Sequence, residues 1–431
     1  MNLERFHLPG GCPVWVQRRS GPDLISAKLL IPGGSAADPP GSRGVTQLLA
    51  GVLTRGCGPL SGDQLAELVE GRGAGLRCET SEDALIVSLK CASSDSEALL
   101  PLLLTLVQTP WLQPDQVTLE RDLNLQALQR QREDPFQLAH DQLRHQLYGQ
   151  GPYGHDPLGV EGELGRLGPG DLAARLPDLG LQGAVLVICG QPPGALKEWL
   201  TPLDQPQGPW KTFAPHQNPG PAGEGGERLA LVPDETEQLV LMLGASTVPL
   251  GAPDALALRL LHCHLGIGMS SRLFVALREE HGLAYDVGVH APARRGAAPF
   301  VFHLSSSADR AGEATTRLLD EWQRLLEEPL TAAELSLAVA KFRGQEALGR
   351  QTCSQIADRH ALLLSHGLDW DYADGALAKS RQLVPADLLA AARRWLARPA
   401  LSLCGPATAL AAAERSWQRH RLSDPPALAT R

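Results

Sequence analysis

Residues 44–53 read Gly44-Val45-Thr46-Gln47-Leu48-Leu49-Ala50-Gly51-Val52-Leu53. Apolar side chains recur here at i, i+3, i+4, i+7 and i+8, the spacing of one buried stripe on an α-helix. That stripe consists of Val45, Leu48, Leu49, Val52 and Leu53. Another face of the same helix carries Gln47, Ala50 and Gly51. The pattern predicts a helix that packs into a core and presents a separate face of three residues.

The separate face has a spacing known from peptidases. A His-x-x-Glu-His helix uses these positions to hold two zinc ligands and a general base on one side. Ala50 and Gly51 have no ligating atom, and Gln47 offers a neutral amide, which is a poor zinc ligand. The residues therefore predict no metal site and no bound cofactor in this chain.

The segments around this helix resemble a known family. An apolar strand, Gly-Gly-Ser and an Asp-Pro-Pro turn precede it, as in the inverted-zincin (pitrilysin/insulinase) metallopeptidases. Two further runs are similar to the mitochondrial-processing-peptidase branch: Leu-Tyr-Gly-Gln-Gly-Pro-Tyr-Gly-His-Asp-Pro-Leu-Gly at 147–159, and Gly-Ile-Gly-Met-Ser-Ser-Arg-Leu-Phe-Val-Ala-Leu-Arg-Glu-Glu-His-Gly-Leu-Ala-Tyr-Asp-Val-Gly at 266–288. The family's third zinc ligand is a Glu in the interval corresponding to Leu123–Arg132, which contains no acidic residue here.

The run at 266–288 supplies two candidate catalytic residues. The resemblance implies that Arg278 and Tyr285, seven positions apart, contact substrate beside the scissile bond. A guanidinium and a phenol hydroxyl are hydrogen-bond donors suited to the carbonyl oxygen on which negative charge develops. The pattern also predicts an apolar-faced helix capped by Ser270 or Ser271, followed by a strand from Leu283.

Plainer interpretations of these two residues stay open at this point. Tyr285 alternates with Val287 and Val289, so it could be a core tyrosine of the strand. Arg278 precedes Glu279 and could be an ordinary member of a surface ion pair.

The chain divides into two similar halves. Residues 204–227 are rich in Pro and Gly and predict a linker between domains at 1–203 and 228–431. Each half contains an extended apolar run, a turn and a Leu-rich helix, at 25–56 and 238–266, offset by about 210 residues. We predict a duplicated α+β domain, each copy an antiparallel or mixed sheet with helices packed on one face. The resemblance implies that the chain forms half of a clamshell chamber.

Composition restricts the class of protein. The 431 residues exceed one average domain, and the net charge of −9 argues against nucleic acid or an anionic membrane as partner. No apolar run is long enough for a transmembrane helix, and the N-terminus lacks the features of a secretory signal. We expect a cytoplasmic location. The eight cysteines include no Cys-x-x-Cys pair, which favours free thiols.

The histidines give no convincing metal site. His262 and His264 lie two positions apart, so on a helix with about 100° per residue they do not face one ion. His140, His145 and His155 accompany no matching carboxylate pattern and are expected at the surface.

Two functions remain in contention. The favoured one is a non-zinc-binding subunit of a heterodimeric zinc metallopeptidase, in which a homologous partner with an intact His-x-x-Glu-His holds the zinc. This chain would contribute Arg278 and Tyr285 to the hydrolysis of short or unfolded peptides. The alternative is a catalytically inactive scaffold or peptide-binding member of the family. The Arg/Tyr pair favours the first, since a pure scaffold has no physical need to retain it, and a homodimer stays open.

Overall fold

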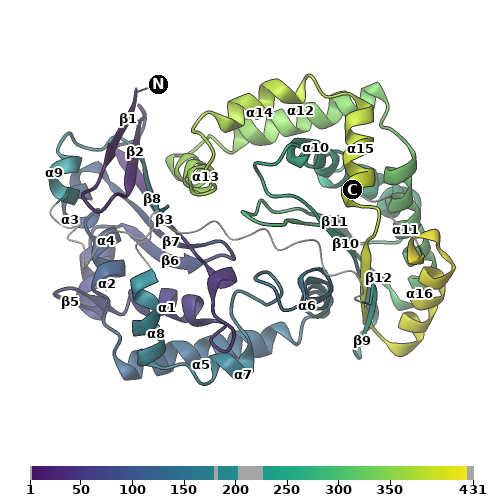
Figure 1. Cartoon of the computed structure of the whole chain (residues 1–431), viewed down its shortest axis with the longest axis horizontal. Coiled ribbons are helices and arrows are strands. Elements are labelled where there is room, and N and C mark those ends of the chain that lie inside the picture. Colours follow the sequence, from purple (N-terminus) through teal and green to yellow (C-terminus); the bar gives the residue numbers. More distant parts are fainter. Residues whose placement is uncertain (1, 179–182, 202–226, 425–431) are drawn as a thin grey trace. The chain divides into compact units, whose positions relative to one another are not determined.

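The computed structural model describes residues 2–178, 183–201 and 227–424. The chain forms two compact units (Figure 1). Unit 1 consists of Met1–Leu128, His155–Pro215 and Ala347–Tyr372, and unit 2 of Gln129–Gly154, His216–Glu346 and Ala373–Arg431. The predicted division at 1–203, 204–227 and 228–431 follows chain order, and residues 204–226 of its linker lie outside the described residues.

Unit 1 contains a mixed six-stranded sheet. Its strands, in order across the sheet, are β1 (Asn2–His7), β2 (Pro13–Arg18), β8 (Val185–Gly190), β3 (Leu24–Pro32), β7 (Ala84–Ala92) and β6 (Gly75–Thr80). All neighbouring strands are antiparallel except β2 and β8, which are parallel. A separate two-stranded hairpin is formed by β4 (Gly56–Cys57) and β5 (Leu60–Ser61).

Unit 2 contains a five-stranded sheet with the same plan. Its strands, in order, are β9 (Leu229–Pro233), β13 (Ala400–Gly405), β10 (Gln238–Ser246), β12 (Pro299–Ser307) and β11 (Asp286–His290). Only β9 and β13 are parallel. This order matches β2-β8-β3-β7-β6 of unit 1 strand for strand, in the same succession along the chain. The predicted duplication is therefore confirmed by topology.

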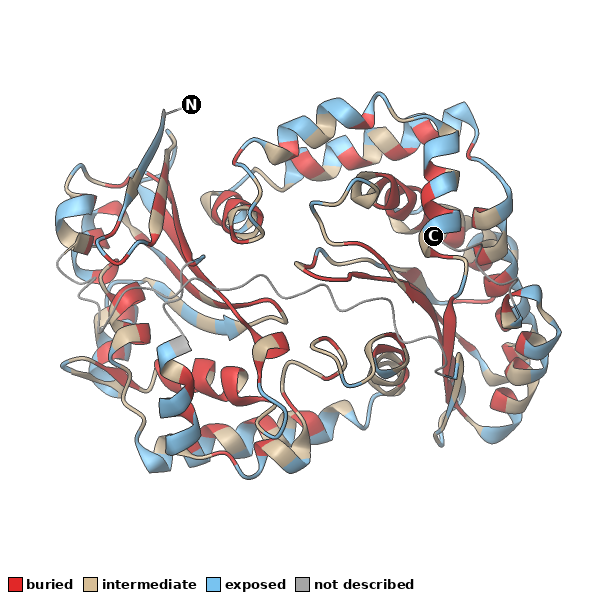
Figure 2. Cartoon of the chain, in the orientation of Figure 1, coloured by how far each residue is buried: buried red, intermediate tan, exposed pale blue. Residues whose placement is uncertain are grey.

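The main core of each unit lies between one face of its sheet and a layer of helices. In unit 1 these helices include α1 (Val45–Leu53), α2 (Gly62–Glu70), α3 (Ser96–Leu99), α4 (Leu102–Gln108), α5 (Pro114–Gln131), α7 (Glu161–Leu164), α8 (Pro169–Arg175) and α9 (Leu196–Leu200). In unit 2 they include α10 (Ala255–Gly266), α11 (Ala311–Glu327), α12 (Ala332–Leu348), α14 (Tyr372–Ser380), α15 (Pro385–Trp395) and α16 (Ala407–Arg419). Figure 2 shows buried residues concentrated on the strands and on one side of these helices.

Each unit also receives one helix from the other half of the sequence. α13 (Cys353–Ser365) covers β3 and β8 of unit 1, where Ile356 packs with Val187. α6 (Pro135–Tyr148) covers β10 and β13 of unit 2, where Leu143 packs with Met242. The opposite face of each sheet is therefore also covered, which adds a layer to the predicted single-faced arrangement.

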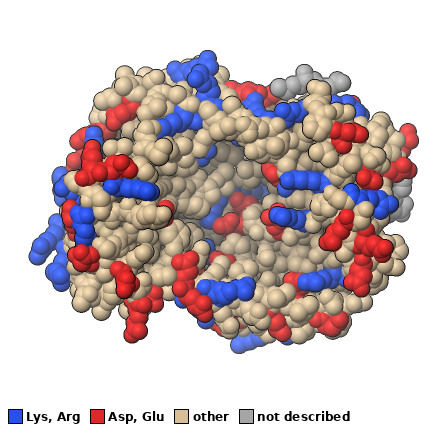
Figure 3. All heavy atoms as spheres, turned by 180° about the vertical axis from the view of Figure 1, so that it is seen from behind, with Lys and Arg blue, Asp and Glu red and all other residues tan. Residues whose placement is uncertain are grey.

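Surface charge and hydropathy give two further findings. On the face drawn in Figure 3, basic and acidic side chains are interspersed, and no broad area of that face is basic alone. Among the described helices, none has both the length and the hydropathy to cross a membrane.

All eight cysteines are free thiols, and all but Cys78 and Cys353 are buried.

Candidate functional site

α1 is the helix that carries the degenerate motif, and its first turn is firmly held. The Asp38 carboxylate accepts hydrogen bonds from the backbone N–H of Gly44 at 2.8 Å and of Thr46 at 3.3 Å. A carboxylate at this end compensates the helix dipole and the free N–H groups. Gly44 has φ of 104°, and a Cβ there would lie 2.8 Å from the carbonyl oxygen of Leu158. The 147–159 run therefore ends against the start of α1.

The three-residue face of α1 does not fit a zinc ion. Gln47 is half-buried, and Ala50 is fully buried. At Gly51 a Cβ would lie 2.6 Å from Oε2 of Glu120, a buried residue of α5. Within the described ranges, no group of three or more His, Cys, Asp or Glu side chains is arranged to hold a metal. The space beside Gly51 is occupied by a carboxylate, not by a ligand set.

Glu120 has a cationic partner of its own. Nε of Arg55, two residues beyond α1, donates to Oε1 of Glu120 at 2.8 Å. Glu120 lies outside Leu123–Arg132, the interval in which the family resemblance places an acidic ligand, so the pair was not predicted. A signal was present, since Val117, Glu120, Asn124 and Leu128 form the buried stripe of α5. A carboxylate within such a stripe requires a hydrogen-bonding or charged partner.

Arg278 and Tyr285 are brought together in unit 2. Nη1 of Arg278 donates to the backbone carbonyl of Tyr285 at 2.9 Å. The guanidinium carbon lies 5.2 Å from the Tyr285 ring centroid and 4.8 Å from that of Phe274, within the range of cation–π attraction. The Tyr285 side chain itself is 85% exposed. The pair thus places an exposed phenol beside a half-buried guanidinium.

The plainer interpretations of the pair are wrong. An exposed fraction of 85% excludes Tyr285 from the core, whereas Leu283 and Ala284 before it are buried. In the part of the chain that the structure describes, Arg278 forms no ion pair, and its guanidinium contacts Tyr285 and Phe274.

The local secondary structure differs from the prediction in two ways. Residues Phe274–Glu280 form a π-helix, and no serine side chain caps it; Ser271 instead accepts a hydrogen bond from the Val275 N–H through its backbone carbonyl. The strand β11 begins at Asp286, so Tyr285 stands just before it. A π-helical turn is rare and frequently marks a functional site. A helical repeat in the sequence does not reveal that the turn of Phe274–Glu280 is π-helical.

Comparison with protein families agrees with these features. Residues 14–159 match the family model of insulinase (peptidase family M16), and residues 182–342 match that of the peptidase M16 inactive domain. Together the two segments span more than half of the chain. The chain belongs to peptidase family M16.

Relatives of this M16 chain match most of its length at low identity. An uncharacterized zinc protease of Streptomyces coelicolor is 24% identical over 425 residues, covering 94% of this chain and 90% of that protein. The crystal structure of a peptidase M16 inactive domain from Pseudomonas fluorescens superposes with a TM-score of 0.86 at 21% identity, covering 94% and 98% of the two chains. The crystal structure of a protease from Helicobacter pylori superposes with a TM-score of 0.82 at 17% identity, covering 94% of this chain and 100% of that chain. At these identities the solved structures establish the M16 fold.

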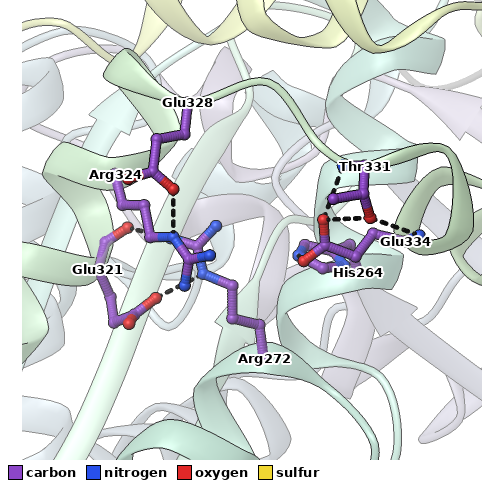
Figure 4. A network of polar contacts seen from close by, with 7 residues as sticks. All are labelled: His264, Arg272, Glu321, Arg324, Glu328, Thr331 and Glu334. Atoms are coloured by element: carbon purple, nitrogen blue, oxygen red, sulfur yellow. Dashed lines mark hydrogen bonds and ion pairs between the residues drawn. The ribbon is translucent and has the colours of Figure 1, made fainter.

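Several histidines of this M16 chain lie deeper than expected. His140 packs edge to face against His290, with ring centroids 5.7 Å apart, and His155 is buried; both were expected at the surface. His262 bonds to Arg259 through Nδ1 at 2.8 Å, whereas Nε2 of His264 lies 3.9 Å from Glu334 (Figure 4). His262 and His264 thus have separate partners, as their helical spacing predicts.

These histidines predict a loss of stability in acid. Burial is the main cause that lowers the pKa of His262 and His264 to about 4 and of His140 to about 3. An unfolded histidine has a pKa of about 6.5, so between about pH 6.5 and pH 4 the unfolded chain binds more protons than the folded one. We expect the free energy of unfolding, measured with urea, to be lower at about pH 5 than at about pH 7.5. Each histidine contributes on the order of 1–3 kcal/mol.

The variant His264→Gln tests this origin of the acid sensitivity, because it removes one titrating group from the core of unit 2. Its free energy of unfolding should depend less steeply on pH in the same window. An unchanged slope would show that His264 is not a source of the acid sensitivity.

Proposed function

We propose that this chain is a non-zinc-binding subunit of a heterodimeric zinc metallopeptidase, in the mitochondrial-processing-peptidase-like branch of M16. The observation that carries the proposal is the exposed Tyr285 beside Arg278. A large aromatic side chain that is 85% exposed gains almost nothing for the stability of its own fold. The position of this exposed ring next to the guanidinium of Arg278 is best explained by a ligand that contacts both side chains.

The pair has the donors that peptide hydrolysis needs. When a nucleophile attacks a peptide carbonyl, negative charge develops on the oxygen, and hydrogen-bond donors placed there lower the barrier. The Tyr285 hydroxyl is a donor, and Arg278 uses one N–H for the Tyr285 carbonyl while others remain for a substrate. Because Arg278 is bound to the backbone carbonyl of Tyr285 and lies over its ring, the two side chains are next to each other before substrate binds.

The metal would come from the partner. Gln47, Ala50 and Gly51 offer no zinc ligand set, and the Glu120 carboxylate, paired with Arg55, lies where an added side chain at Gly51 would stand. The partner is accordingly a homologous subunit with an intact His-x-x-Glu-His, and the substrate a short or unfolded peptide. An extended peptide can pair with a sheet edge, and β6 is such an edge in unit 1, beside α1.

Copurification tests the proposal. The chain is isolated from its native cells, its zinc content is measured, and hydrolysis of an unstructured fluorogenic peptide is assayed with and without a chelator. We expect well under one zinc per chain for the isolated protein, no activity of either subunit alone, and chelator-sensitive activity with a homologous partner. A stoichiometric zinc in the isolated chain would refute our interpretation of Gln47, Ala50 and Gly51. A chain that is recovered alone and inactive would favour the scaffold or peptide-binding alternative.

A further inference from the structure

The segment that carries Arg278 is attached to α11 at both of its ends. The segment runs from Arg272, just before the π-helix Phe274–Glu280, to Gly282 just after it. Within the π-helix itself, Leu277 is the buried residue. Apolar burial along the helix is therefore sparse, and contacts at its ends must contribute to fixing its geometry.

The first attachment is a buried ion pair. Nε of Arg272 donates to Oε2 of Glu321 at 2.5 Å, and Nη2 donates to the backbone carbonyl of the same residue at 2.8 Å. The two side chains are only 10% and 15% exposed. Figure 4 shows Arg272 directed at Glu321, while the neighbouring Arg324 is directed at Glu328. Two hydrogen bonds to one residue of α11 fix both the position and the direction of Arg272.

The second attachment holds the other end. Nη1 of Arg310 donates to the carbonyl oxygens of His281 and Gly282, each at 3.0 Å. Nη2 of the same guanidinium donates to Glu313 at 2.9 Å. Carbonyl groups at the end of a helix lack partners within it, and Arg310 satisfies two of them. Gly282 has φ of 56°, so the chain turns sharply here toward Tyr285.

Both attachments use the same support. Arg310 immediately precedes α11, and Glu321 lies within it, about 16 Å further along a helix that rises 1.5 Å per residue. α11 is itself anchored in the core of unit 2 through Leu318, Leu319 and Trp322, all fully buried. The helix α11, together with Arg310 just before it, therefore contacts the two ends of the π-helical segment.

We propose that Arg272 and Arg310 are positioning residues, which hold Arg278 beside Tyr285 by fastening the π-helix to α11 at both ends. The consequence for peptide hydrolysis rests on the function proposed above. The positioning itself is a property of this chain and can be measured without a partner.

The test follows Tyr285 directly. The full chain is labelled with 3-fluorotyrosine, which places a reporter at each of its four tyrosines, and the Tyr285 signal is assigned with Tyr285→Phe. In Arg310→Ala we expect the ¹⁹F signal of Tyr285 to shift or broaden while those of Tyr148, Tyr153 and Tyr372 stay in place. The matched control is Arg324→Ala, which removes a guanidinium bound to Glu328 from the same helix and should leave all four signals unchanged.

A second variant keeps the test independent of folding defects. Removing one member of a buried ion pair can unfold a protein, whereas replacing both with apolar residues of similar volume is often tolerated. The double variant Arg272→Met with Glu321→Leu should therefore fold and still move the Tyr285 signal. An unmoved Tyr285 signal in both this variant and Arg310→Ala would overturn the positioning proposal.

Kinetics in the assembled peptidase separate this proposal from the proposed function. With the fluorogenic peptide, Arg310→Ala should lower kcat roughly 10-fold or more with little change in KM, and Arg310→Lys should recover part of the loss. If Arg310→Ala moves Tyr285 but neither it nor Arg278→Ala changes turnover, the proposed function fails and the positioning stands. If Arg278→Ala abolishes turnover while neither Arg310→Ala nor the double variant alters the Tyr285 signal or kcat, the positioning proposal alone fails.

Discussion

On the proposed function, replacing Arg278 by alanine is expected to lower kcat/KM of the assembled peptidase by about 10² or more, because the variant lacks a donor that would face the developing negative charge. Tyr285→Phe, which keeps the ring and removes only the hydroxyl, should cause a loss of similar size. The measurement is steady-state hydrolysis of the fluorogenic peptide by the purified complex.

The controls for this prediction come from the same π-helix. Glu279 is exposed on it, so Glu279→Gln changes charge beside Arg278 without removing a donor of the pair. We expect Glu279→Gln to retain nearly full activity. Size-exclusion chromatography establishes that each variant still assembles with its partner. Near-normal turnover of Arg278→Ala or Tyr285→Phe in an intact complex would remove that residue from the mechanism.

Trp322→Ala is expected to lower the free energy of unfolding by about 3–5 kcal/mol. Trp322 is fully buried in α11 and meets Phe302 of β12 edge to face, with ring centroids 4.7 Å apart. Its indole N–H donates to the carbonyl of Leu396 at 2.8 Å. Alanine would leave a cavity between helix and sheet and a buried carbonyl without its donor. Urea denaturation followed by circular dichroism measures the loss.

A second substitution separates packing from hydrogen bonding at this position. Trp322→Phe keeps an aromatic ring against Phe302 but removes the N–H, so we expect a smaller loss of about 1–3 kcal/mol. Equal losses for the two variants would mean that the hydrogen bond to Leu396 dominates. A loss below about 1 kcal/mol for Trp322→Ala would contradict its place in the core of unit 2.

Much of the fold could be predicted because its signals are local. The apolar stripe of residues 45–53 is α1, and the extended run at 238–243 lies within β10. A helix or strand buries one face at a fixed period, so the spacing of its apolar residues can be recognised within a short stretch of sequence. The duplication could also be predicted from the sequence, because both halves of the chain begin with the same strand–turn–helix order.

The exchange of α6 and α13 between units was not predictable in the same way. The stripe Ala139, Leu143 and Leu147 indicates that one face of α6 is buried. It carries no information on which sheet covers that face, since Leu and Val surfaces of either sheet would serve. Only the folded chain places this stripe against Val240 and Met242 of unit 2.

The sequence by itself determined the family and the two sheets, because these depend on which side chains are present and at what spacing. That Gln47, Ala50 and Gly51 hold no zinc stays a prediction from the chemistry of those side chains. The tertiary structure decided the rest of the candidate site. It placed Glu120 over Gly51, wound Phe274–Glu280 as a π-helix and left Tyr285 exposed beside Arg278. Those outcomes depend on packing and ion pairing between segments far apart in the chain, and no local pattern encodes which distant group will lie opposite a given side chain.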